Sequence, residues 1–164
     1  MKMSESMIYD CGKDIAERLM QRVKATTGTE SKGEAVIAFV GQQQELEMLA
    51  SECWFTPMLV TVVENKLSKL SFVNIDSDRD LTQEDGRKIG SSLAMSLAVN
   101  LTAAGAVDEW ILQYPALQRL DRENEWLRPM LVVIGTTLVG EVGWGLKVIQ
   151  RHAQDSKRLD HHSP

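Results

Sequence analysis

The chain contains 164 residues, of which 43% are hydrophobic and 25% are charged, a balance that is usual for a globular protein with one core. We therefore expect residues 1–164 to form a single domain. The formal net charge of −5 gives no electrostatic support for nucleic-acid binding, so we expect no nucleic-acid partner.

The first element in chain order is an N-terminal amphipathic helix, which we expect within residues 1–27. From Ser4 to Val23 the apolar residues fall three or four positions apart, the spacing that places side chains on one face of a helix. These apolar residues are Ile8, Cys11, Ile15 and Leu19. The polar stretch TTGTESKGE at 26–34 then predicts a loop.

The segment that follows is compatible with two folds. The apolar run AVIAFV is typical of a short strand, whereas the next stretch, QQQELEMLASEC, suits a helix. We favour a helix over residues 57–70, because Thr56 and Pro57 are typical of a helix start. β-branched residues are also frequent here, and they favour strands. The alternative is therefore an α+β fold with a small antiparallel sheet from 35–40, 58–63 and 70–75.

A long helix is predicted from residue 83 to about residue 104, and we expect it to be the longest in the protein. Thr82 and Asp85 resemble a capping box, in which two side chains satisfy free amides at the start of a helix. Residues 89–107 carry no charge. Small residues spaced four apart form a stripe that lets another helix approach closely. This stripe consists of Gly90, Ala94 and Ala98.

A second apolar segment, residues 130–146, is interrupted by Glu141. Each glycine in it would weaken a helix in water by about 1 kcal/mol, but glycine is better tolerated where helices pack closely or meet lipid. We expect a basic or hydrogen-bonding group to meet Glu141. The predicted packing interface combines small residues of both segments with this carboxylate. Its members are Gly90, Ala94, Ala98, Gly140, Glu141 and Gly143.

The polar C-terminal tail, residues 150–164, contains all three histidines of the chain. A Ser-His-Asp or Cys-His site would have to recruit one of them from the tail, and no zinc-binding motif is present. We therefore expect a protein that is not an enzyme and has no resident cofactor. Cys53 is expected to be a small buried residue.

The two cysteines are too few for a disulfide framework, although one bridge between them is an open alternative. We expect reduced thiols, which are usual in the cytoplasm. The first ten residues contain no apolar core segment, so no secretory signal is expected.

The stretch NIDSDRDLTQED, residues 74–85, places oxygen-bearing residues at positions 1, 3, 5, 7, 9 and 12. This spacing resembles an EF-hand calcium loop, which would bind the ion through these positions. Arg79 stands where that loop has glycine, and no second loop accompanies it. We favour capping of the following helix, with calcium binding as the alternative. The calcium ligands would be Asn74, Asp76, Asp78, Asp80, Thr82 and Asp85.

These patterns favour a mainly α-helical bundle with helices that pack through glycine and alanine. The predicted function is a non-enzymatic structural or interaction subunit of a larger assembly, such as a virus particle. Its partners would be copies of itself in a homo-oligomer, another protein or a membrane, which the segments 89–107 and 130–146 would contact. The expected location is the cytoplasm, the assembly itself or a membrane surface. The alternative function is a calcium-binding module.

Overall fold

The computed structural model describes residues 4–26, 28–64, 80–99 and 102–140. Over these residues the chain forms eight α-helices and one 3₁₀ turn, η1, and no strand, which confirms the predicted mainly helical bundle. The elements are α1 (Glu5–Lys24), α2 (Lys32–Gln42), η1 (Gln44–Leu46), α3 (Glu47–Ala50), α4 (Phe55–Glu64), α5 (Gln83–Val99), α6 (Ala103–Gln113), α7 (Pro115–Glu123) and α8 (Leu127–Gly140).

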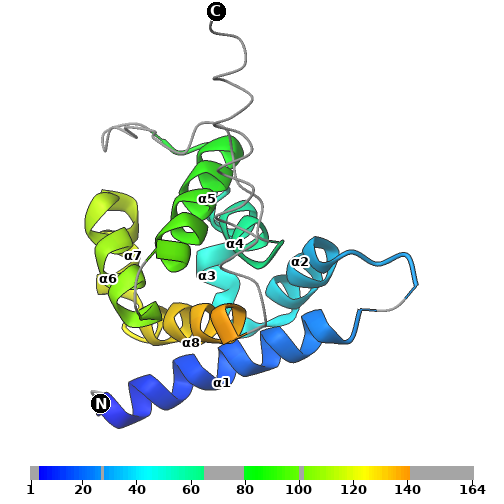
Figure 1. Ribbon diagram of the computed structural model, residues 1–164, viewed down its shortest axis with the longest axis horizontal. Coiled ribbons are helices and arrows are strands. Elements are labelled where there is room, and N and C mark those ends of the chain that lie inside the picture. The colour runs from blue at the N-terminus through cyan, green and yellow to red at the C-terminus, as the bar shows by residue number, and fades with distance from the viewer. Residues whose placement is uncertain (1–3, 27, 65–79, 100–101, 141–164) are drawn as a thin grey trace, which may run out of the picture.

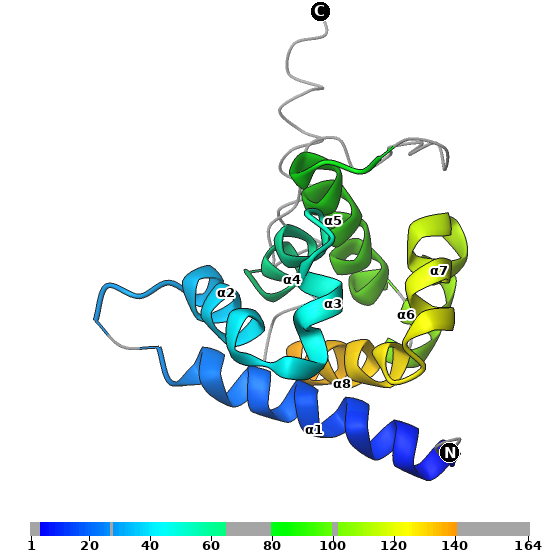
Figure 2. The same ribbon diagram turned by 180° about the vertical axis from the view of Figure 1, so that it is seen from behind.

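Helices α1 and α8 pack side by side along one edge of the bundle (Figure 1). Helices α4 and α5 make the most extensive contact of any two described helices, and α2 packs against α4. Helix α6 contacts both α5 and α8. Figures 1 and 2 show α2 on one side of the bundle and the α6–α7 pair on the other. One hydrophobic core runs through these contacts.

The alternative with a small sheet is wrong for two of its three segments. Residues 35–40 lie in α2 and residues 58–63 lie in α4, whereas 70–75 are outside the described residues. The hydroxyl of Ser31 accepts a hydrogen bond from the backbone amide of Glu34 at 3.1 Å and so caps α2. Burial in α2 then follows a helical rather than an alternating pattern. The buried apolar residues are Ala35, Val36, Phe39 and Val40.

The predicted N-terminal amphipathic helix is confirmed as α1. The hydroxyl of Ser4 accepts a hydrogen bond from the amide of Met7 at 3.2 Å at its start. A glycine in the middle of the helix allows α8 to come close. A Cβ atom added at Gly12 would lie only 2.5 Å from the carbonyl oxygen of Trp126, which real Cβ atoms do not tolerate. Gly12 is therefore a packing residue that periodicity alone did not identify.

The helix predicted over residues 83–104 is shorter than expected. Helix α5 ends at Val99, and Thr102 is extended, with φ −134° and ψ 149°. Its hydroxyl accepts a hydrogen bond from the amide of Gly105 at 3.0 Å and begins α6. The continuous apolar composition of this region concealed the break. The longest described helix is therefore α1, with 20 residues against 17 in α5.

Small residues bring α5 onto α4. A Cβ atom added at Gly86 would lie 2.1 Å from the carbonyl oxygen of Trp54, and one added at Gly90 would lie 2.5 Å from that of Met58. Ala94, the next residue at this spacing, is completely buried. The small-residue stripe of α5 thus begins one turn earlier than the sequence suggested, and these residues serve a contact within the chain.

Trp110 of α6 connects that helix to α5 through a buried hydrogen bond. The indole N–H of Trp110 donates a hydrogen bond to the carbonyl oxygen of Ile89 at 3.0 Å, and the ring is fully buried. Its partner in the core is the ring of Tyr114, packed edge to face at a centroid distance of 6.5 Å. A buried indole with a satisfied N–H contributes apolar packing without the cost of an unpaired donor.

Candidate functional site

The residues of the predicted packing interface separate into three groups. Gly90 and Ala94 are buried in the chain's own core, so they are not available to a second molecule. Ala98 lies near the end of α5, and Gly140 is the last residue of α8. The two remaining members, Glu141 and Gly143, lie outside the described residues, so the expectation that a basic or hydrogen-bonding group meets Glu141 stays a prediction.

The acidic stretch at 74–85 is described only from Asp80 onward, so three of the calcium ligands considered, Asn74, Asp76 and Asp78, lie outside the described residues. The predicted capping box is confirmed. The carboxylate of Asp85 accepts hydrogen bonds from the amide and the hydroxyl of Thr82 at 2.8 and 3.0 Å. The hydroxyl of Thr82 in turn accepts a bond from the amide of Asp85 at 3.2 Å. These two side chains therefore secure the start of α5.

Asp80 is exposed, whereas Asp85 is buried. Within the part of the chain that the structure describes, no three histidine, cysteine or carboxylate side chains come together in a group that could hold a metal ion.

A helix must be both long and apolar to cross a membrane. No single helix among residues 4–26, 28–64, 80–99 and 102–140 is both long and apolar enough to cross a membrane. One pair of segments, Gln44–Ala50 and Phe55–Glu64, passes the test together, but the two are bent by 109°.

The two cysteines are free thiols, as expected. The prediction that Cys53 is buried is wrong, because it lies exposed between α3 and α4, where its Sγ is 3.1 Å from the carbonyl oxygen of Leu81. Burial raises the pKa of the half-buried Cys11 thiol, and the nearby carboxylates of Glu45 and Asp14 raise it further. The apolar neighbours Trp54 and Phe55, rather than the cysteine, supply the buried side chains of this region.

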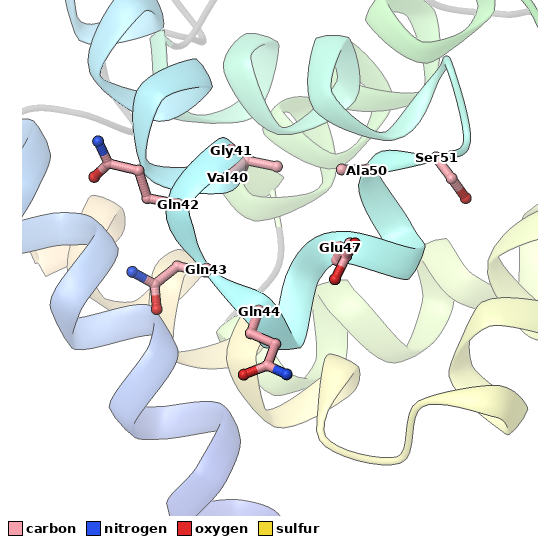
Figure 3. Close-up of a pocket in the computed structure, with 8 residues that line it drawn as sticks. All are labelled: Val40, Gly41, Gln42, Gln43, Gln44, Glu47, Ala50 and Ser51. Carbon is pink, nitrogen blue, oxygen red and sulfur yellow. The ribbon is translucent and has the colours of Figure 1, made fainter.

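The candidate site is a pocket of about 500 Å³ at the bend between α2 and α3 (Figure 3). Val40 and Ala50 face each other across it and form its apolar floor. Polar residues and one glycine complete the lining. They are Gly41, Gln42, Gln43, Gln44, Glu47 and Ser51.

The bend exists because α2 ends at an extended residue. Gln43 has φ −97° and ψ 117°, which turns the chain away from the helix axis into η1. Leu46 and Leu49 then point into the core and are 0% and 1% exposed. Their burial turns the opposite side of α3 outward, and this side carries Glu47 and Met48.

Helix α1 holds the bend in place through Arg18. The guanidinium of Arg18 donates a hydrogen bond to the side-chain oxygen of Gln43 and forms ion pairs with Asp14 at 3.0 Å and Glu45 at 3.6 Å. On the other side of the bend, the hydroxyl of Ser51 donates a hydrogen bond to the carbonyl oxygen of Met48 at 2.6 Å. The bend is therefore held by α1, and the turn at the end of α3 is closed by its own hydrogen bond.

The two helices that contribute to the pocket, α2 and α3, each carry one large apolar side chain that is exposed. Met48 is 80% exposed in α3, and Ile37 is 56% exposed in α2. Ile37 lies one helical turn before Gly41, so both belong to the same face of α2. Burying such side chains is favourable by about 25 cal/mol per Å² of apolar surface, and methionine is frequent on surfaces that bind other proteins.

The polar groups of the rim are available to a partner. Among the described residues, the side chains of Gln42, Gln44 and Glu47 have no hydrogen-bond or ion-pair partner. Each glutamine amide can donate and accept hydrogen bonds, and the carboxylate can accept them. The pocket thus combines an apolar floor with free polar groups at its rim.

Sequence reasoning missed this site because 35–40 was compatible with a strand. Once the segment is assigned as a helix, Ile37 is an exposed residue at the edge of the face that buries Val36 and Val40. A large aliphatic residue on the solvent face of a helix was the signal that could have indicated the site.

Comparison with protein-family models, with curated proteins and with solved structures finds no match to this chain.

Proposed function

We propose that the protein is a non-catalytic interaction subunit of a larger protein assembly, and that it binds another protein through the surface formed by α2, η1 and α3. The observation that carries the proposal is the pocket at the bend, together with the exposed Ile37 and Met48 on the two helices that contribute to it. A partner side chain placed there would bury apolar surface at the centre of a contact and leave a polar rim, the arrangement that supplies most of the affinity in protein interfaces.

The size of the pocket indicates its role in such a contact. A stable interface buries roughly 1,600 Å² in total, which is more than one pocket offers. The pocket would therefore receive the central anchoring residue, while the exposed faces of α2 and α3 would supply the surrounding contact. Because Gly90 and Ala94 are engaged inside the chain, the proposed assembly surface differs from the small-residue stripe.

Position-specific photo-crosslinking tests the proposal. A photoreactive residue replaces Met48 in one variant and Leu112 of α6 in the control, since Leu112 is similarly exposed at 73%. We expect a discrete adduct only from position 48, in the cells in which the protein is naturally made. The partner identified by mass spectrometry should then bind the purified wild-type chain and lose binding to Met48→Ser but not to Leu112→Ser.

Two results would overturn the proposal. One is equal crosslinking from both positions. The other is retention of full binding by Met48→Ser together with Ile37→Ser. An adduct of twice the chain mass of 18.3 kDa would instead identify a second copy as the partner, and light scattering in water and in mild detergent would then measure the oligomer.

A further inference from the structure

We infer that the segment which binds to this pocket is basic and amphipathic. One of its apolar side chains enters between Val40 and Ala50, and a neighbouring lysine or arginine pairs with Glu47. The inference rests on the proposed function and adds the chemistry of the partner to it.

The need for a basic partner follows from the charges around the pocket. Its lining includes one carboxylate, that of Glu47, and no basic side chain. Arg18, the cation of α1 that holds the bend, already pairs with Asp14 and Glu45. A partner that covers Glu47 must compensate its charge, because an unpaired carboxylate is costly to remove from water. A lysine or arginine does so directly.

The need for an apolar side chain beside that cation follows from the floor of the pocket. Val40 and Ala50 have aliphatic side chains, so neither can hydrogen-bond to a polar occupant through its side chain. The lining has open space beside Gly41, because a Cβ atom added there would meet no atom of a non-neighbouring residue within 4 Å. An aliphatic or aromatic side chain therefore suits the floor better than a polar one, and Ile37 and Met48 offer further exposed apolar surface on the same two helices.

The glutamines at the rim suit the backbone of such a segment. The amides of Gln42 and Gln44 can each offer a donor and an acceptor to peptide groups of the partner. A second copy of this chain is the less suitable occupant, because the chain has 23 acidic and 18 basic residues and a net charge of −5. Like charges facing each other across a contact oppose binding.

Three labelled peptides of equal length test the inference by fluorescence anisotropy at physiological salt concentration. They alternate leucine with lysine, with glutamate or with serine. We expect the lysine–leucine peptide to bind most tightly. Glu47→Lys should weaken its binding by roughly tenfold or more, since the variant replaces an attraction by a repulsion. Gly41→Trp should abolish binding by filling the pocket, and circular dichroism would verify that both variants fold.

A matched control separates local from general charge effects. Glu109→Lys on α6 changes the net charge by the same amount, at an exposed residue on a helix across the bundle from α2. It should leave affinity within about twofold, since screening limits the reach of an exposed charge to roughly 8 Å. Equal weakening by Glu109→Lys and Glu47→Lys would overturn the inference.

The same measurements distinguish the inference from the proposed function. If the serine or glutamate peptide binds best and Gly41→Trp still blocks it, the pocket binds a peptide but the basic chemistry is wrong. If Gly41→Trp changes the binding of none of the three peptides, the pocket does not bind peptides, and both statements fail.

Discussion

Replacing Gly90 with Ala is expected to destabilise the protein, although alanine favours a helix over glycine by about 1 kcal/mol. The added Cβ atom would lie 2.5 Å from the carbonyl oxygen of Met58 and 2.9 Å from Cβ of Thr61. The first contact is with backbone, which cannot rotate away, so α4 and α5 must separate slightly. Overpacking of this kind costs about 1–3 kcal/mol. Subtracting the helix preference leaves a net loss of about 1 kcal/mol in the free energy of unfolding.

The matched control is Gly41→Ala in α2. It makes the same chemical change in a helix, but the added Cβ atom has no neighbour within 4 Å. It should therefore stabilise the protein by up to about 1 kcal/mol. Urea denaturation measures both values, and a change of 1 kcal/mol corresponds to roughly 2–4 °C in melting temperature for a chain of this size. If Gly90→Ala stabilises the protein as much as Gly41→Ala does, the close packing of α5 on α4 is refuted.

Three further predictions concern single side chains. Iodoacetamide should label exposed Cys53 before Cys11, because the raised pKa of Cys11 lowers its thiolate fraction. Digestion and mass spectrometry would measure the two labelling rates, and equal rates would contradict the prediction. Hydrogen bonds from Arg22 lower the pKa of Glu30, so this pair stabilises the fold at neutral pH and its contribution is lost as pH falls below about 4. Arg22→Gln should abolish that acid-dependent loss in urea titrations. Thr82→Ala should reduce the free energy of unfolding by about 1 kcal/mol, whereas Thr82→Ser should retain it.

The fold class was predictable because most helices are indicated by residues that lie close together in the sequence. The apolar period of α1 and the Thr82–Asp85 capping box depend on residues within one or two turns, and both were identified correctly. The helix break at Thr102 was missed, because the apolar composition continues across it. The main local sign of the break is the Thr102 hydroxyl, which caps the start of α6. The β-branched residues of α4 left both helix and strand possible. Their preference for strands is weak, and their burial in the core as part of a helix outweighs it.

The pocket could not have been predicted, because it depends on contacts between segments that are distant in the sequence. Arg18 and Gln43 are 25 residues apart, and nothing in either segment indicates that they meet. The different roles of Gly86 and Gly41 are equally invisible in the sequence. Gly86 and Gly41 both lie in helices, yet a Cβ atom would clash with Trp54 at the first and meet open space at the second. Periodicity can suggest which face is small, but only the neighbouring helix decides whether that face is filled.

The same segments contribute to the pocket and to the core, and this bears on how a partner would bind. Leu46 and Leu49 anchor η1 and α3 in the core, while Arg18 fixes the bend from α1. The apolar floor and the exposed Met48 are therefore carried by a segment whose backbone is already held in place. A surface fixed before contact loses less conformational entropy on binding than a loop that must first become ordered. A small pocket on a rigid bend can thus serve as the anchor of a larger interface, even though its own area is limited.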